Sequence, residues 1–390
     1  MNEILKTTLL GLFFGTFGTT IGGILGIVIN KNSNKFLSFV LSFASGLMMA
    51  IICFDLIPEA LGISSIYGVI LGVLLGIISM IFCDVIVQKK FNSKEQKYKN
   101  GIEITEDKLK KLKKILLEML IDFDVVCEKN NLYYTLCGGT ALGAVRHNGF
   151  IPWDDDVDIF MTRESYNKFL TIYEKKLKNK YTLHSPETTP ELGIPLAQIS
   201  LNGTIYKTHL APERKNPGIF VDIFILENTP DNVVLRDIHG FFSLFFGLAL
   251  SCSRFYKDRK FYLQAFDGAD IKTLRAIKNK IFLGKLFNVF LSTKKWVQLT
   301  NWWNSLCKNN NSKYVSVPSG RKHYFGEMYL REKMCKRQNI LFVSKELPVI
   351  QDYDYYFKKL YGPNYMIPPP EKDREVHCIF ELELGNEKSI

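Results

Sequence analysis

The sequence lacks paired cysteines. Its eight cysteines are scattered, at Cys53, Cys83, Cys127, Cys137, Cys252, Cys307, Cys335 and Cys378. Because no two of them form a Cys-x-x-Cys pair, neither a zinc knuckle nor a disulfide framework is indicated. Scattered cysteines of this kind are typical of a reducing compartment, so we expect free thiols.

Recognisable nucleic-acid-binding modules are also missing, and no nucleic-acid partner is expected. The 390 residues nevertheless carry a net charge of +11 and a pI near 9.1. Such a charge favours an anionic partner, for example a nucleotide, a phosphorylated glycan or a lipid headgroup. Basic residues are rare up to Val87 and dense after Gln88. The chain therefore divides into a short apolar part and a basic remainder.

The apolar part holds three stretches long enough to span a bilayer, Leu9–Ile29, Phe36–Ile57 and Ile66–Val87. A cleaved signal peptide fits less well, because the first stretch lacks a strongly basic n-region and two more stretches follow at once. By the positive-inside rule, Lys31, Lys35 and the lysines after Gln88 predict an N-terminus outside and a cytoplasmic remainder. We expect a three-helix transmembrane anchor over residues 1–88, in a plasma membrane or cell inner membrane.

A second pattern concerns the middle stretch. SFASGLMMAIICFDLIPEAL (Ser42–Leu61) resembles the second helix of ZIP-type metal transporters, including its Asp-x-x-Pro-Glu ending. The later helices of that family, with their metal-binding motifs, are absent from the sequence. Glycines spaced four apart in the first and third stretches suit close helix packing. We interpret this part as an anchor, with a metal-transport or metal-sensing role through Asp55 and Asp84 as the alternative.

The basic remainder begins with a polar linker, residues 89–104. A helix is predicted after Thr105, because apolar residues recur there at helical spacing. The stretch Phe241–Cys252 is too short to span a membrane. We predict a buried core helix there, and an interfacial helix near lipid-linked acceptors is the alternative.

The densest group of chemically active residues is GGTALGAVRHNGFIPWDDDVDIF, from Gly138 to Phe160. Tyr133–Cys137 before it is predicted as a strand, and Thr140–His147 as a helix. The turn at Gly138 and Gly139 would then present free N–H groups at a helix N-terminus, which suits a phosphate. A tight turn without a ligand is the alternative.

The aspartates in this stretch repel one another unless water or a cation relieves the charge. Asp156 and Asp158 are predicted on one face of a strand, which suits divalent-metal chemistry on phosphates. An acidic turn in water is the alternative. A lone Asp222 interrupts the apolar strand GIFVDIFIL (Gly218–Leu226), where an unpaired carboxylate would be costly. We predict that it completes the metal site, with a hydrogen-bonded structural role as the alternative.

These motifs resemble a known family. Gly-Gly, then Asp-x-Asp on one strand, then a single Asp on another, resembles the polymerase-β-like nucleotidyltransferase superfamily. The stretch from Gly138 to Phe160 resembles the LicD family of phosphocholine transferases, relatives of fukutin-type sugar-phosphate transferases. LYGPNYMIPPPEKDREVH (Leu360–His377) resembles that family's closing motif. One departure is Gln198, where relatives tend to have a basic residue.

The resemblance covers roughly Thr105–Leu384. It implies an α+β, polymerase-β-like nucleotidyltransferase fold over residues 105–390, with a mixed sheet flanked by helices. The three transmembrane helices predicted from the apolar stretches precede this domain and are not typical of the family. The implied activity is that of a phosphotransferase. It would move phosphocholine from CDP-choline or a similar CDP-alcohol to a cell-surface glycan precursor, in lipopolysaccharide or teichoic acid modification.

By the same resemblance, Mg²⁺ or Mn²⁺ would be bound by Asp156, Asp158 and Asp222. Asp154 would be a further ligand or an acceptor-side base, and Asp155 is expected to face solvent. The residues expected to bind substrate are Gly138, Gly139, Thr140, Arg146, His147, Arg374 and His377. Alternative activities are transfer of ribitol phosphate, glycerol phosphate or phosphoethanolamine. A non-catalytic membrane scaffold or metal-linked regulator is the alternative of another class.

Overall fold

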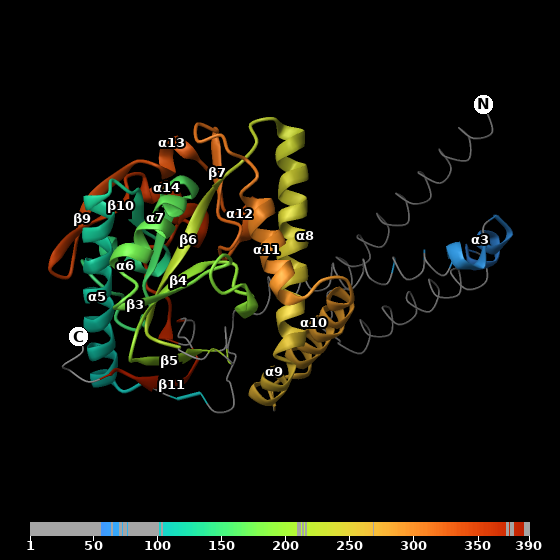
Figure 1. The fold of residues 1–390 in the computed structure, drawn as a ribbon, viewed down its shortest axis with the longest axis horizontal. Coiled ribbons are helices and arrows are strands. Elements are labelled where there is room, and N and C mark those ends of the chain that lie inside the picture. Colours follow the sequence, from blue (N-terminus) through green and yellow to red (C-terminus); the bar gives the residue numbers. More distant parts are fainter. Residues whose placement is uncertain are drawn as a thin grey trace, which may run out of the picture. The chain divides into compact units, whose positions relative to one another are not determined.

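The computed structural model describes residues 104–208, 217–267, 269–371 and 378–385, with 101–102, 212, 214 and 374 (Figure 1). Nearer the N-terminus it describes residues 56–63, 65–69, 72 and 76. The chain divides into two units, Met1–Phe82 and Cys83–Ile390, and each is taken by itself.

The first unit contains the short helix α3 (Ile57–Ile63). Nearly all of the three predicted spans and most of the predicted linker lie outside the described residues. The same holds for Asp55, Asp84 and most of the ZIP-like stretch. The three-helix anchor therefore stays a prediction.

In the part of the second unit that the structure describes, the strands form a nine-stranded mixed sheet. Its strands are β1 (Tyr134–Leu136), β2 (Asp158–Thr162), β3 (Tyr181–His184), β4 (Ala197–Leu201), β6 (Phe220–Asn228), β7 (Tyr314–Ser316), β8 (Met328–Leu330), β9 (Arg337–Phe342) and β10 (Lys345–Ile350). They follow the order β3-β4-β6-β2-β1-β10-β9, with β7 on β6 and β8 on β7. Only the β2–β6 and β1–β10 pairs of this sheet are parallel. A separate pair joins β5 (Ile205–Thr208) to β11 (Ile379–Glu383).

Helices flank this sheet, which confirms the predicted mixed sheet with helical layers (Figure 1). They are α5 (Glu106–Lys129), α6 (Gly138–His147), α7 (Arg163–Lys176), η2 (Pro190–Leu192), α8 (Val233–Lys257), α9 (Arg259–Ala265), α10 (Ile271–Phe290), α11 (Thr293–Asn304), α12 (His323–Gly326), α13 (Arg331–Met334) and α14 (Tyr353–Tyr361). In Figure 1, α5 and α8 stand on opposite sides of this unit.

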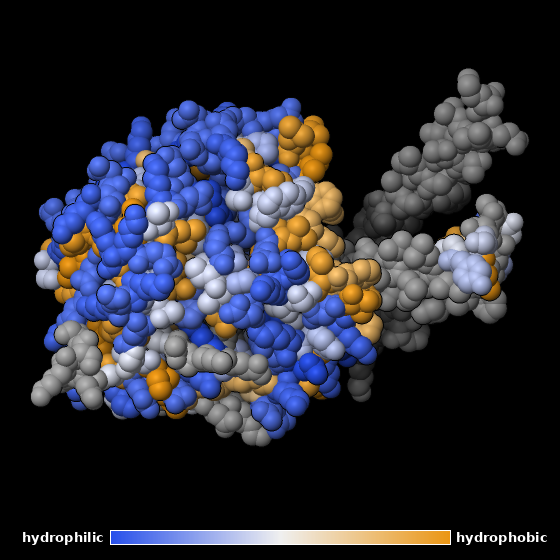
Figure 2. Space-filling model, in the orientation of Figure 1, coloured by the Kyte–Doolittle hydropathy of each residue, from blue (hydrophilic) through white to orange (hydrophobic). Residues whose placement is uncertain are grey.

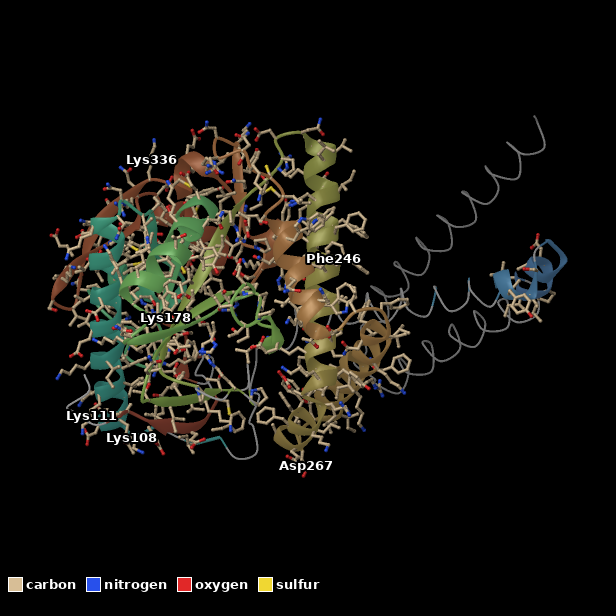
Figure 3. All side chains as sticks on the ribbon, viewed as in Figure 1. Lys108, Lys111, Lys178, Phe246, Asp267 and Lys336 are labelled. Carbon is tan, nitrogen blue, oxygen red and sulfur yellow. The ribbon has the colours of Figure 1, made fainter. Side chains whose placement is uncertain are left out.

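The predicted helix after Thr105 is confirmed as α5. The Thr105 hydroxyl accepts a hydrogen bond from the Lys108 N–H at 3.4 Å, which satisfies one of the free donors of the first turn. Leu112, Leu116 and Leu120, which share one face, are buried in the main core. Figure 3 labels Lys108 and Lys111, which lie near the start of this helix. The six described cysteines are free thiols, as expected.

The prediction of a short, buried helix at Phe241–Cys252 is wrong. The helix there, α8, has 25 residues and is long and apolar enough to cross a membrane by length and composition. Only 28% of its most apolar window is buried. The apolar stretch in the sequence is shorter than the helix, because the charged pair Arg236-Asp237 interrupts the apolar pattern near the N-terminal end.

Candidate active site

Asp158 and Asp222 are direct neighbours in the sheet. The parallel strands β2 and β6 are in register with Asp158 opposite Asp222. The pairing extends one residue upstream, because the Asp222 N–H donates to the Val157 carbonyl at 2.9 Å. Residues that stand opposite each other in a ladder point to the same face. The register therefore brings two carboxylates from distant parts of the sequence to one face of the sheet.

The aspartates before β2 alternate between two environments. Asp154, Asp156 and Asp158 are half-buried and line one cavity, although only Asp158 belongs to the strand itself. The prediction that Asp155 faces solvent is wrong, because its side chain is 2% exposed. Its Oδ2 accepts a hydrogen bond from the Tyr206 hydroxyl at 3.1 Å. The alternation of an extended strand begins upstream of β2 and turns Asp155 inward.

A lysine from α5 fixes the turn that leads into these aspartates. Lys113 Nζ donates to the carbonyl oxygens of Ile151 and Pro152, at 2.9 and 2.8 Å. Burial lowers the pKa of Lys113, and the charges of Asp154 and Asp155 oppose that effect. The turn is thereby held on a helix that is itself anchored in the core.

A cavity of about 680 Å³ opens beside the three alternating aspartates. This volume suits a nucleotide-sized or smaller ligand. Part of its wall is aromatic and comes from the aspartate segment, the sheet and the chain in and after α14. The aromatic lining residues are Trp153, Phe160, Phe224, Tyr356, Tyr361 and Tyr365. Carboxylates and aromatic rings thus face one space.

The N-terminus of α6 also lines this cavity. The helix begins at Gly138, so the glycine pair forms its first turn instead of preceding it. Gly138 has φ +54°, and its N–H donates to the Tyr356 hydroxyl at 2.9 Å. A Cβ at Gly138 would lie 2.7 Å from Asp158 Oδ2, and a Cβ at Gly139 would lie 2.7 Å from Asp154 Oδ2. Glycine is needed here so that the carboxylates can approach the positive end of the helix.

Three other predicted substrate residues of α6 have roles within the protein. The buried Thr140 hydroxyl accepts a hydrogen bond from the Asp158 N–H at 2.9 Å, so it positions the start of β2. Arg146 lines the cavity and donates to the Tyr365 carbonyl at 3.0 Å and to His147 Nε2 at 2.9 Å. Burial, followed by the charge of Arg146, lowers the pKa of His147. His147 is therefore a neutral acceptor that orients Arg146.

Arg374 lies beside the cavity through an aromatic contact. Its guanidinium is 4.1 Å from the centroid of the Trp153 ring, and Nη1 donates to Glu371 Oε1 at 3.2 Å. Arg374 Nε is buried and has no hydrogen-bond partner among the described residues. This arrangement leaves one donor available beside a cavity-lining ring. His377 lies outside the described residues.

Sequence reasoning missed Arg214. In the sheet, Gln198 stands opposite both His184 and Asp222. The Gln198 amide donates to Asp222 Oδ1 at 2.7 Å and accepts from Arg214 Nη1 at 2.9 Å. Burial lowers the pKa of Arg214 to about 10, and the charge of Asp222 opposes that effect. The positive charge that seemed to be missing at Gln198 is therefore supplied by Arg214, which reaches Asp222 through the Gln198 amide. No motif in the sequence marks Arg214.

Sequence reasoning also missed Glu327. This residue lines the cavity, although its overall exposure is only 2%. The Lys322 N–H donates to its Oε1 at 2.8 Å. Burial raises the pKa of Glu327 to about 7, against the opposing charges of Lys322, Arg321 and Lys359. A carboxyl group that changes protonation near neutral pH suits acid–base chemistry, but nothing in its local sequence distinguishes it.

The donor set fits a hard divalent cation. Asp154, Asp155 and Asp156 each offer an oxygen, and these oxygens lie within 4.8 Å of one another. Carboxylate oxygens are the ligands that Mg²⁺ and Mn²⁺ prefer. The grouping differs in detail from the predicted trio, because Asp158 and Asp222 form a register pair next to this cluster. Of the cluster, Asp154 and Asp156 face the cavity.

Residues 131–240, which include β1, α6 and both aspartate-bearing strands, match the family described as LicD/FKTN/FKRP, nucleotidyltransferase domain. This part of the chain is therefore similar to a LicD-type nucleotidyltransferase domain. The lipopolysaccharide cholinephosphotransferase LicD of Haemophilus influenzae is 28% identical over 284 residues, 69% of this chain and 96% of that protein. Uncharacterized proteins of Rickettsia typhi and Rickettsia prowazekii are each 33% identical, over 102 and 97 residues. These cover 25% and 23% of this chain, and 33% and 35% of the relatives.

Within the matched segment and the chain that follows it, the predicted site residues separate into two groups. Those that line the cavity are Gly138, Gly139, Arg146, Asp154, Asp156 and Asp158. Asp222, Thr140 and His147 contact or adjoin members of that group, and Arg374 contacts the cavity-lining ring of Trp153. The two motifs that carried the resemblance are brought together, since Tyr361 and Tyr365 of the closing motif line the same cavity.

Proposed function

We propose that the protein transfers phosphocholine, or a related phospho-alcohol, from a CDP-activated donor to a hydroxyl of a cell-surface glycan precursor. The observation that carries this proposal is the register pair Asp158–Asp222 next to a cavity that Asp154, Asp156 and the α6 N-terminus also line. Similarity over nearly the whole length of a lipopolysaccharide cholinephosphotransferase supports a phosphotransferase with this kind of substrate.

The chain's own residues have distinct tasks in this proposal. Asp154, Asp156, Asp158 and Asp222 would hold Mg²⁺ or Mn²⁺, which would neutralise the donor's diphosphate and make the incoming hydroxyl more acidic. Arg146 and Arg374 supply positive charge at or beside the cavity for the departing CMP. The cavity walls would hold the phosphorus in line with the hydroxyl.

We assign the receipt of the hydroxyl proton to Glu327. It shares the cavity with the aspartates, and its pKa of about 7 matches the working pH of a general base. The aromatic wall suits a quaternary ammonium, since cations are attracted to ring faces. This favours choline over ribitol or glycerol as the transferred alcohol.

The test is CMP release from purified protein with CDP-choline, CDP-ethanolamine, CDP-glycerol and CDP-ribitol, each with and without Mg²⁺ and a glycan acceptor. We expect CDP-choline to be used best. A clear preference for CDP-glycerol or CDP-ribitol would change the transferred group and keep the reaction. No release from any donor would favour a non-catalytic scaffold instead.

The membrane location belongs to the same proposal. The catalytic unit would face the cytoplasm, where CDP-activated donors are made, and residues 1–88 would anchor it. Among the described residues, α8 alone is long and apolar enough to be a candidate span. Labelling of a cysteine placed before residue 9 with an impermeant reagent on intact cells tests the predicted outside position of the N-terminus.

A further inference from the structure

The helices α8 to α11, residues 233–304, form an arm. This arm exposes many large apolar side chains. Most of the N-terminal half of α8 is open to solvent, and so is the end of α10. The exposed apolar residues of the arm include Val234, Ile238, Phe241 and Phe242 on α8, Phe282, Val289 and Phe290 on α10, and Trp302 on α11. Phe290 is 72% exposed, far from the burial expected of a phenylalanine. In Figure 2, hydrophobic side chains gather over α8 and α10.

The apolar side chains of α8 form a stripe that reaches α10. Val234, Ile238, Phe241 and Phe245 recur at helical spacing, so they form a single stripe along α8. The stripe connects to α10 through Phe245 and Phe287, whose ring centroids are 6.1 Å apart. Figure 3 labels Phe246, the next residue on this helix. A contiguous apolar face of this kind marks an interaction surface.

The opposite face of α8 is hydrogen-bonded to the rest of the unit. His239 Nδ1 lies 3.0 Å from the Tyr324 hydroxyl, and its Nε2 lies 2.8 Å from the Trp303 carbonyl. The Ser243 hydroxyl donates to Asn304 Oδ1 at 2.7 Å. If α8 crossed a bilayer, these buried polar groups would lose their partners in hydrocarbon. The helix is therefore built to lie in the plane of an interface, with one face on the protein.

Charge identifies the occupant of the exposed face. Residues 233–304 contain 12 Lys and Arg against 4 Asp and Glu, a net +8 of the chain's +11. The exposed basic residues are Arg259, Lys260, Lys272, Arg275, Lys278, Lys285, Lys294 and Lys295. A second copy of the same arm would be repelled by this charge. An apolar stripe with basic flanks complements a bilayer that carries anionic headgroups.

We propose that the arm docks in plane on an anionic lipid bilayer, with the stripe on α8, the end of α10 and Trp302 entering the headgroup region. This surface is separate from the cavity, and the proposal does not depend on the reaction. It would keep the cavity at a fixed height above a membrane.

The experiment uses the full chain in vesicles of phosphatidylcholine with or without phosphatidylglycerol. A fluorophore is attached to Phe241→Cys or Phe290→Cys, and lipids carry a quencher near the headgroup. Leu341→Cys, an exposed apolar position on β9, is the matched control. The parent protein is labelled in parallel to correct for its own thiols. We expect strong quenching of both arm probes on anionic vesicles, weaker quenching on neutral ones, and little at Leu341→Cys.

The second part of the test removes positive charges from the arm one at a time. Lys278→Gln and Lys285→Gln should each weaken docking on anionic vesicles roughly fivefold and leave neutral vesicles unchanged. Arm probes that are quenched no more than the control would overturn the proposal. So would arm probes that are already shielded in detergent without lipid, which would show that the N-terminal unit or a second copy covers the face.

Discussion

Replacing Glu327 by glutamine isolates the energetic consequence of burying a carboxyl group in the cavity. The substitution keeps the size of the side chain and removes its charge. Burial raises the pKa of Glu327 from 4.5 to about 7, which corresponds to about 3 kcal/mol between its two protonation states. Between these pH values the folded chain holds a proton that the unfolded chain has released. The stabilising contribution of Glu327 is therefore complete below pH 4.5 and is lost as the pH rises through about 7.

The contribution of His184 to stability changes with pH in the opposite direction. Burial, followed by the charge of Arg214, lowers the pKa of His184 to about 4. Its contribution to stability thus grows as the pH rises from about 4 to 6.5, while that of Glu327 declines. The two effects oppose each other in the wild-type protein, so only the difference between variant and wild type reports on Glu327.

Thermal unfolding of both proteins in detergent, followed at about pH 4.5 and about pH 8, measures that difference. Relative to wild type, Glu327→Gln should gain about 3 kcal/mol on going to the higher pH, roughly 6 °C in Tm for a unit of this size. The exposed Glu346→Gln should show no such change. A Glu327→Gln difference that is independent of pH would refute the raised pKa. If Glu327 receives the hydroxyl proton, CMP release by the variant should also lose its rise with pH through about 7.

Three other substitutions test the surroundings of the site. Gly139→Ala places a Cβ against Asp154 and should reduce CMP release roughly 100-fold; a Tm within a few degrees of wild type would show that the loss is local, and full activity would contradict the tight fit. Gln198→Met separates Asp222 from Arg214 and should cost about 1–3 kcal/mol in denaturant unfolding, so unchanged stability would mean that the amide bridge is unimportant. Arg163→Met leaves Glu227 buried without its partner and should cost about 3–5 kcal/mol. The double variant with Glu227→Met should recover most of that loss, and equal losses in both would argue against a charge effect.

Sequence patterns predicted those helices and strands whose own residue spacing shows which face is buried. Helical spacing identified α5, and a lone carboxylate in an apolar run identified the strand of Asp222, because both patterns follow directly from burial of one face. Asp155 was predicted to face solvent, which is wrong, because the alternation of buried and half-buried side chains in β2 continues upstream of the strand. The extent of α8 was missed because its apolar pattern is interrupted by charge.

The rest of the site depends on contacts between distant segments. Arg214 reaches Asp222 through Gln198, and Glu327 reaches the cavity from the chain after α12. Neither residue stands in a motif, and each owes its role to the sheet order that brings the segments together. Such residues become visible only in the folded chain.

The most direct test of the central claim is Mg²⁺-dependent CMP release by Asp158→Asn and Asp222→Asn. These residues are paired across β2 and β6, so each variant should lose roughly 100-fold or more in activity while its circular dichroism matches the wild type. Asp122→Asn, a partly exposed aspartate on α5, is the matched control and should keep full activity. Full activity in both site variants would contradict the assignment of this carboxylate pair to the reaction.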